Sequence, residues 1–495
     1  MKIKPFLNKE PVQVGFLLLA GLIFRCLMIS SRGIWYDDAF SILLSRQSFT
    51  QIITGTAADT MPPLYYFLLH VWMRISTQIW WMRVLSILLS MSALVLLYFI
   101  ARRVASKRAA MWALVWGVVS PFQIYHAQEL RMYTLLQLAQ VAYIFFFVKI
   151  IQADRPGWRL WAGFVLSGVI SLYTHNLAIF FLPVADLYLL MRKRWYLLGK
   201  VVLAQAGMVL LFSPWIFLVP GQVQKIQTAF WTERPGLLEV VQGAVNFIGS
   251  LYPTGMLLLV VSAASLILLV FFLFLFFRKA DISSDQKFFF GALVLTTPIL
   301  LFAVSYLMRP IFVPRGFITS MLFFYASGGM VVAAIRPKLA RYLLGLTVAG
   351  VALLSLPDQY LFDRFPRSPF NKAIGETDSR MTEEAVILHD NKLSFFPAYV
   401  YHPEIRQVFL ADAPGSTNDT YALQTQQAID LFPEPSVDEA VDGYQEVYFV
   451  VFERTLEDYR SLGVETHPVL DWLEAHYDLA DLRNYEDLLI YHYLK

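Results

Sequence analysis

The chain is dominated by apolar runs long enough to cross a lipid bilayer as helices, which takes about 20 residues each. Several of the runs are short or interrupted by polar residues. The pattern predicts an all-α polytopic membrane domain with about eleven transmembrane helices. The runs cover residues 11–30, 80–101, 109–124, 133–151, 160–174, 177–191, 197–218, 255–277, 287–307, 316–335 and 342–356.

One further apolar stretch, residues 62–76, is too short to span a bilayer. We interpret it as a helix that lies in the outer membrane interface, with Tyr65, Tyr66 and Trp72 at the depth of the lipid headgroups. The first outer loop then covers residues 31–79 and contains interfacial helices.

Charge is distributed unevenly along the chain. Residues 1–356 carry a net charge of +19, whereas residues 357–495 carry −16. Only 16% of the residues are charged, against about 25% in soluble domains, which is typical of a membrane protein. The basic excess requires no nucleic acid, because it lies in clusters between alternate spans, as in cytoplasmic loops. The clusters are Lys2, Lys4 and Lys9; Arg102, Arg103, Lys107 and Arg108; Arg155 and Arg159; Arg192, Lys193, Arg194 and Lys200; Arg278, Lys279 and Lys287; and Arg336, Lys338 and Arg341.

These clusters fall on one side of the membrane if the N-terminus is cytoplasmic. An odd number of spans then places the acidic tail on the other side. The sequence predicts a multi-pass protein of a plasma membrane, the inner membrane in a bacterium, with an extracytoplasmic C-terminal domain. Most acidic side chains of the membrane region also fall on the outer side, so we expect the chemistry there.

The tail, residues 357–495, predicts a small soluble α/β domain that follows the transmembrane domain of residues 1–356. Four short apolar runs read as strands, and residues 466–477 read as an amphipathic helix capped by Thr466. The predicted strands are 385–389, 407–411, 446–452 and 487–494. The one cysteine, Cys26, excludes a disulfide within the chain.

Asp37 and Asp38 stand close to the end of the first apolar run, within the stretch RGIWYDDAFS. Aspartates at the start of a helix can simply cap it. A carboxylate there could instead be the general base of a sugar transferase, taking the proton from an attacking hydroxyl. Because adjacent residues point in different directions on a helix, we expect one to be the base and the other to orient it or bind the acceptor.

The stretch HAQELRMY, residues 126–133, is unusually polar for the mouth between two spans. At helical spacing, Glu129 shares a face with Tyr133, and Gln128 shares one with Arg131. An ordinary ion pair in a loop is the alternative. The functional interpretation assigns a phosphate to Arg131, because the planar guanidinium suits phosphate oxygens, and a sugar hydroxyl to Glu129.

Two outer turns add weaker candidates. Arg309 and Arg315 lie in MRPIFVPRGF, where basic residues are disfavoured. They could extend towards lipid headgroups, or bind the phosphate of a lipid carrier. His175, in the turn YTHN, is a candidate for binding donor or acceptor, and a purely structural role is the alternative.

The ordered motifs WYDD, MPPLYY, SPFQIYHAQELRMY and YTHN resemble those of the protein O-mannosyltransferase and lipid A aminoarabinose transferase group of the GT-C superfamily. The resemblance covers roughly residues 10–340. It implies that Asp37 is the catalytic base, with Asp38 beside it. Where the family has His-Pro-Pro this chain has Met61-Pro62-Pro63, and its usual Ser-Gln-Glu is Ala127-Gln128-Glu129.

The resemblance implies a glycosyltransferase with a polyprenyl-phosphate-linked sugar as donor, inversion at the anomeric carbon, and no nucleotide. The acceptor is a lipid, a polysaccharide or a protein. No metal-ligand cluster is evident, although Asp37 and Glu129 could share a divalent ion. A transporter or flippase for lipid-linked sugars is the alternative function. The candidate site comprises catalytic Asp37, Asp38 and Glu129; phosphate-binding Arg131 and Arg315; and donor- or acceptor-binding Tyr65, Tyr125, His126, Gln128, Tyr133 and His175.

Overall fold

The computed structural model describes residues 10–228, 232–413, 416 and 419–495, so the predicted basic positions Lys2, Lys4 and Lys9 lie outside the described residues. It divides the chain into two compact units. Unit 1 comprises residues 1–29 and 60–360, and unit 2 comprises residues 30–59 and 361–495. The predicted first outer loop is therefore divided: residues up to 59 belong to unit 2 with the tail, and residues from 60 belong to unit 1.

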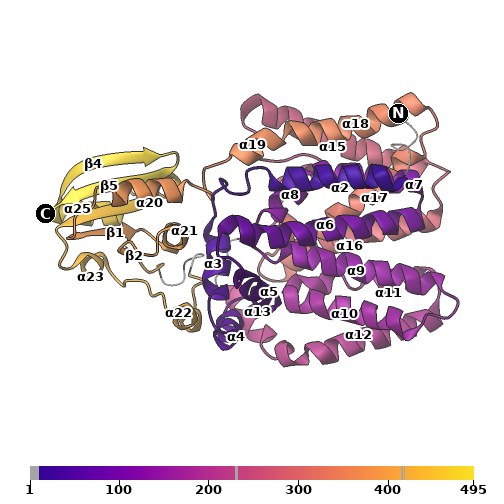
Figure 1. Cartoon of the computed structure of the whole chain (residues 1–495), viewed down its shortest axis with the longest axis horizontal. Helices are drawn as coiled ribbons and strands as arrows, with labels where there is room; N and C mark the ends of the chain where they lie inside the picture. Colours follow the sequence, from indigo (N-terminus) through magenta and orange to yellow (C-terminus); the bar gives the residue numbers. More distant parts are fainter. Residues whose placement is uncertain (1–9, 229–231, 414–415, 417–418) are drawn as a thin grey trace. The chain divides into compact units, whose positions relative to one another are not determined.

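Every regular element among the described residues of unit 1 is a helix. Figure 1 shows α2, α6, α9 and α10 running side by side. Its elements are α2 (Glu10–Cys26), α5 (Leu64–Met73), α6 (Ile79–Val104), α7 (Lys107–Val119), α8 (Pro121–Ala127), α9 (Tyr133–Gln152), α10 (Trp158–Thr174), η1 (Asn176–Phe180), α11 (Val184–Met191), α12 (Trp195–Ile216), α13 (Val219–Thr228), α14 (Leu237–Val245), α15 (Gly255–Arg278), α16 (Ser284–Leu307), η2 (Pro314–Phe317), α17 (Ile318–Ala333) and α18 (Lys338–Leu354), and α19 (Leu356–Leu361) leads into unit 2.

Each of the eleven apolar runs falls in one or more of these helices. Within the described residues, seven helices are long and apolar enough to cross a membrane. The remaining runs form shorter helices, and polar or helix-breaking residues divide two of these runs, 109–124 and 177–191. For example, Ser120 caps α8 and Pro121 occupies its first position, which separates α8 from α7. The stretch predicted to be interfacial contains α5, which has only 10 residues.

Unit 2 is a five-stranded sheet covered by helices, in the order β2-β1-β3-β5-β4. The strands β2, β1 and β3 are parallel, β5 pairs antiparallel with β3, and the edge strand β4 pairs antiparallel with β5. Its elements are α3 (Tyr36–Ser45), α4 (Phe49–Ala58), α20 (Phe370–Asp378), β1 (Ala385–His389), α21 (Lys392–Tyr401), β2 (Gln407–Phe409), α22 (Leu423–Ile429), α23 (Val437–Val441), β3 (Glu446–Phe452), α24 (Glu453–Ser461), α25 (Pro468–His476), β4 (Asp478–Tyr485) and β5 (Leu488–Leu494).

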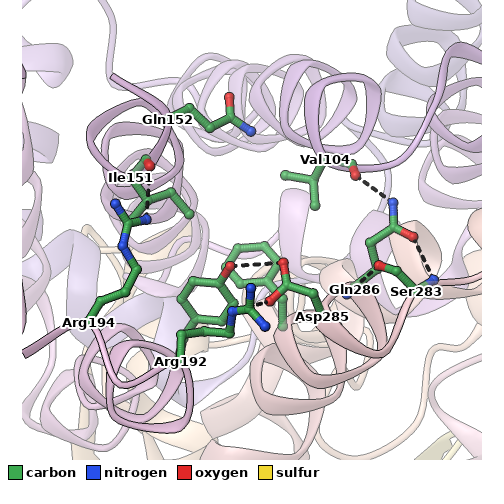
Figure 2. Close-up of a pocket in the computed structure, with 10 residues that line it drawn as sticks. Val104, Ile151, Gln152, Arg192, Arg194, Ser283, Asp285 and Gln286 are labelled. Atoms are coloured by element: carbon green, nitrogen blue, oxygen red, sulfur yellow. Dashed lines mark hydrogen bonds and ion pairs between the residues drawn. The ribbon is translucent and has the colours of Figure 1, made fainter. Parts of the chain in front are cut away.

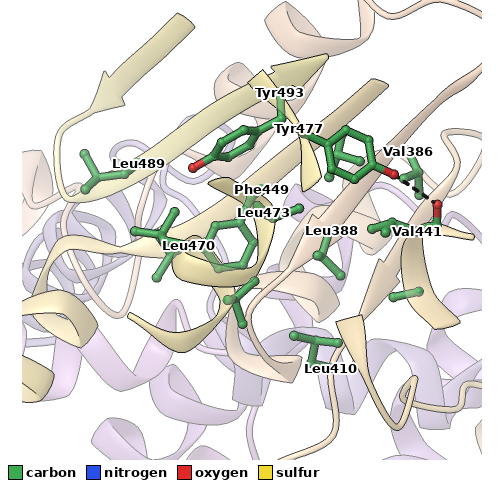
Figure 3. Close-up of a cluster of buried hydrophobic side chains, with 14 of the residues drawn as sticks. Val386, Leu388, Leu410, Val441, Phe449, Leu470, Leu473, Tyr477, Leu489 and Tyr493 are labelled. Atoms are coloured by element: carbon green, nitrogen blue, oxygen red, sulfur yellow. Dashed lines mark hydrogen bonds between the residues drawn. The ribbon is translucent and has the colours of Figure 1, made fainter. Parts of the chain in front are cut away.

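Alternation along the central strands supplies both faces of the sheet. Val386 and Leu388 point to the side of α25, where Phe449 and Leu473 are buried with them (Figure 3). Ala385 and Ile387 instead join the core cluster on the opposite face, which contains residues of α20 and α21. Successive side chains in a strand point to opposite faces, so one apolar strand serves two cores.

Two expectations for the tail need correction. The helix α25 is capped by His467, whose Nδ1 accepts a bond from the Val469 amide at 3.3 Å, and not by Thr466. The strand β4 was not predicted. Its sequence, DLADLRNY, is mostly exposed on the sheet edge and has no apolar run, because an edge strand needs little burial.

Candidate active site

The polar stretch between α8 and α9 is buried and fixed by backbone contacts. The Gln128 side chain donates to the carbonyl oxygens of Arg25 and Leu27, at 2.9 and 2.7 Å. The Ser86 hydroxyl donates to the Glu129 carbonyl at 2.7 Å. The stretch is therefore tied to the end of α2 and to α6 before any ligand binds.

The predicted helical faces in this stretch are wrong, because α8 ends at Ala127 and α9 begins only at Tyr133. Glu129 therefore does not share a helical face with Tyr133. Its carboxylate instead pairs with His126 Nδ1 at 2.5 Å, and both side chains are buried. The His126 ring contacts the Tyr133 ring with centroids 5.3 Å apart.

The two predicted phosphate-binding arginines contact neighbouring tyrosines of unit 1. Arg131 Nη1 donates to the Tyr66 hydroxyl at 3.4 Å, and Tyr65 packs against Tyr66 with ring centroids 6.0 Å apart. Arg315, from η2, lies over the Tyr133 ring at 5.7 Å. These contacts place both guanidinium groups around the start of α9.

His175 joins the same group. Its ring lies 6.0 Å from the Tyr133 ring, and its Nδ1 accepts a bond from the Leu177 amide at 3.0 Å. Burial, together with the charges of Arg131 and Arg315, lowers the pKa of His175 to about 3. The ring is therefore neutral at physiological pH, and because Nδ1 is the acceptor, the proton lies on Nε2.

A buried glutamine network positions the turn that carries Arg315. Gln137 of α9 donates to the Gln123 side chain at 2.8 Å and to the Ile318 carbonyl at 3.1 Å. Gln123 of α8 also donates to the Ile318 carbonyl, at 3.3 Å. Since Ile318 is the first residue of α17, these bonds hold the start of that helix against α8 and α9.

The catalytic candidates of unit 2 lie in the first turn of α3. Asp38 is fully buried and pairs with Arg367 at 3.2 Å; Arg367 also donates to the Gly33 carbonyl at 2.7 Å. Asp37 is partly exposed, and its carbonyl accepts a bond from Ser41. The two neighbours thus differ: Asp38 is held by a cation, and Asp37 reaches the surface of unit 2.

The sequence candidates therefore fall into separate sets. In unit 1 the structure brings together His126, Glu129, Arg131, Tyr133, His175 and Arg315. Tyr65 contacts Tyr66, which accepts the bond from Arg131. Tyr125 stacks on Tyr252 at 5.2 Å, and Gln128 is engaged with backbone. Asp37 and Asp38 belong to unit 2. Among the described residues, no group of three or more His, Cys, Asp or Glu side chains could hold a metal ion.

Four contributors were not predicted: Arg25, Tyr66, Gln123 and Gln137. Arg25 is buried in the first apolar helix and donates to the Gly117 and Val118 carbonyls. A signal for Arg25 and Gln137 exists in the sequence, because a charged or polar side chain within an apolar span usually has a specific partner. Arg367 was also missed, since nothing in the acidic tail connects it to residue 38.

Part of unit 1 matches a known protein family. Residues 60–217, which contain most of the unit 1 candidates, match the sequence model of the family described as dolichyl-phosphate-mannose-protein mannosyltransferase. No curated protein matches the chain.

Two solved structures share the fold over nearly the whole chain. ArnT from Cupriavidus metallidurans, bound to undecaprenyl phosphate, is 13% identical with a TM-score of 0.60, and the match covers 97% of each chain. The oligosaccharyltransferase AglB from Archaeoglobus fulgidus, in complex with an inhibitory peptide and a dolichol-phosphate, is 12% identical with a TM-score of 0.54. That match covers 97% of this chain and 74% of AglB.

The chain is thus a multi-pass membrane protein that shares its fold with ArnT and AglB. The predicted resemblance to the mannosyltransferase and aminoarabinose transferase group is confirmed, as is the fold class. The family match also supports the predicted enzyme class, a glycosyltransferase.

Proposed function

We propose that the protein transfers a sugar from a polyprenyl-phosphate-linked donor to an acceptor on the outer face of the membrane. The observation that carries the proposal is the buried group around Tyr133. It combines Arg131 and Arg315 with a neutral His175 whose Nε2–H is a hydrogen-bond donor. Two guanidinium groups and one N–H donor suit the oxygens of the donor's phosphodiester and of the polyprenyl-phosphate monoester that leaves.

In this proposal Arg131 and Arg315 hold the lipid phosphate. Negative charge develops on that phosphate as its bond to the anomeric carbon breaks, so fixed cations stabilise the transition state more than the ground state. Glu129, oriented by His126, accepts a hydrogen bond from a sugar hydroxyl. Tyr65, Tyr125 and Tyr133 flank the donor, and Gln128 keeps the stretch in place.

Asp37 is the proposed base. The acceptor hydroxyl oxygen forms a bond to the anomeric carbon, the carbon–oxygen bond to phosphate breaks, and the hydroxyl proton passes to the Asp37 carboxylate. Attack opposite the leaving group inverts the anomeric centre. Asp38 acts through its bond with Arg367, which fixes the first turn of α3 and so orients Asp37.

Two relatives support the donor class. ArnT was solved bound to undecaprenyl phosphate and AglB with a dolichol-phosphate, both polyprenyl-type phosphates.

We further propose that the basic loops are cytoplasmic and that the soluble domain, residues 357–495, is extracytoplasmic. A flipped lipid-linked sugar is then the donor within reach, because nucleotide sugars stay in the cytoplasm.

Mass spectrometry of lipids that co-purify with the full-length protein tests the donor class. We expect a polyprenyl-phosphate sugar to co-purify with the native protein and to be depleted about tenfold in Arg315→Gln, the loss that corresponds to one charge-assisted contact. The matched control is Arg341→Gln, which removes an arginine bonded only to the Ile335 carbonyl among the described residues. Equal retention by both variants would remove Arg315 from the phosphate site.

A further inference from the structure

A polar pocket lies at the end of the bundle that carries the basic loops, and the proposed chemistry does not use it. Its volume is about 380 Å³, and it lies between the C-terminal ends of α6, α9 and α11 and the start of α16 (Figure 2). Pockets of about 300 Å³ and above accommodate small ligands. Its polar lining includes Gln152, Arg192, Arg194, Asp285 and Gln286.

The acceptor groups of this pocket are already engaged. Asp285 accepts a hydrogen bond from the Tyr188 hydroxyl at 3.1 Å, and its other carboxylate oxygen forms an ion pair with Arg192 Nε at 3.0 Å. The Val104 carbonyl accepts from Gln286 at 2.8 Å, and the Ile151 carbonyl accepts from Arg194 Nη1 at 3.0 Å. Figure 2 shows these bonds lying along the pocket wall.

The remaining groups are donors. Arg192 uses only Nε, and Arg194 only Nη1, in the bonds recorded among the described residues. The side-chain oxygen of Gln152 accepts a bond from Arg103, which leaves the side-chain amide nitrogen of Gln152 as a donor. Asp285 balances one of the two arginines, so the lining keeps one positive charge. A lining of spare donors with a net positive charge favours an anion.

The surroundings indicate the source of that anion. Trp195 and Tyr196 follow Arg194 directly and are 59% and 78% exposed, as in the aromatic belt at headgroup depth. On α11, Leu187, Leu190 and Met191 are exposed next to Arg192, which provides an apolar surface for acyl chains. We propose that this pocket binds the phosphate headgroup of an anionic phospholipid, as basic pockets between membrane helices do.

Native mass spectrometry of the full-length protein in phosphatidylcholine nanodiscs, titrated with phosphatidylglycerol, tests the site. We expect the native protein to prefer phosphatidylglycerol, and Arg194→Gln to weaken its apparent affinity about tenfold. Arg194→Lys keeps the charge and should retain most of the preference. The control is Arg336→Gln, an arginine at the same end that pairs with Asp281 at 3.6 Å outside the pocket.

Two results would overturn the proposal. One is equal phosphatidylglycerol affinity in Arg194→Gln and Arg336→Gln when both variants unfold at the native temperature. The other is displacement of the lipid by inorganic phosphate at equal concentration, which would identify a soluble anion as the ligand. If Arg194→Gln fails to fold, the Gln152→Leu variant answers the same question, because it removes a donor of the lining and leaves the ion pair of Asp285 intact. Native phosphatidylglycerol affinity in folded Gln152→Leu would then overturn the proposal.

Discussion

At the scale of single residues, Asp37 and Asp38 differ in burial, and this difference supports the separate roles that we propose for them. Asp38 is buried against Arg367, an arginine more than 300 positions later in the chain, whereas Asp37 is partly exposed. The residue pattern identified the pair, and the family resemblance alone assigned the base to Asp37. The cation that holds Asp38 could not be predicted, because it lies in a distant segment.

Removing Arg367 should destabilise unit 2. The Arg367→Met variant leaves the Asp38 carboxylate buried without its cation, which typically costs about 3–5 kcal/mol, so we expect a clearly lower thermal unfolding temperature. The control Arg364→Met removes an arginine that is 68% exposed and 3.7 Å from Glu486, and surface pairs contribute about 0–1 kcal/mol. Adding Asp38→Asn to Arg367→Met should restore part of the loss; equal unfolding temperatures for the two arginine variants would contradict this account.

His175 should make stability depend on pH in one direction. Its pKa is about 3 in the folded protein, whereas an exposed histidine titrates near pH ~6.5. Below pH ~6.5 the unfolded chain therefore binds a proton that the folded chain does not, and stability falls as the pH decreases, by up to about 1.4 kcal/mol per pH unit.

The His175→Asn variant tests this linkage, since asparagine can still accept the Leu177 amide bond. Thermal unfolding between pH 6.5 and 4.5 should show a steeper loss for the native protein than for the variant. Parallel curves would mean that His175 titrates normally.

At the scale of elements, the apolar period predicted the membrane helices and the central strands well, because burial against lipid or a core dictates those residues. The polar stretch 126–133 was misread as helical, since Gln128 and Ser86 hold it in another conformation through contacts from α2 and α6. The edge strand β4 was not predicted because its residues are mostly exposed and form no apolar run. Long-range contacts, absent from local patterns, account for the first miss, and the exposure of β4 accounts for the second.

The link between α9 and α17 gives a prediction at this scale. Gln137→Leu removes two bonds and leaves Gln123 without one partner, so the turn with Arg315 should loosen. A lost buried hydrogen bond costs about 1–3 kcal/mol, and we expect the donor KM to rise about tenfold or more with a smaller change in kcat. The control is Gln140→Leu, a buried glutamine of the same helix that makes none of these bonds. Equal KM values in steady-state kinetics would refute the link.

At the scale of the whole molecule, orientation follows from charge. Basic loops alternate with acidic ones along unit 1, and the soluble domain is acidic. The positive-inside rule then predicts that the soluble domain is extracytoplasmic. The boundary at residue 356 and this orientation were both inferred from sequence and stay predictions.

Cysteine labelling checks the orientation. In a Cys26→Ser background, Ser461→Cys lies on the exposed end of α24, and Ala280→Cys lies in the loop between α15 and α16. A membrane-impermeant maleimide should label Ser461→Cys in spheroplasts and Ala280→Cys only after lysis. The reverse pattern would place the soluble domain in the cytoplasm.

The most direct test of the central claim is single-turnover sugar transfer by Asp37→Asn with a polyprenyl-phosphate sugar. Loss of a general base should slow transfer by about 100- to 10,000-fold while donor binding stays within about twofold, because the asparagine keeps the shape without accepting the proton. The matched control Asp363→Asn, at an exposed aspartate of unit 2, should transfer at the native rate. Native-like transfer by Asp37→Asn would contradict the account.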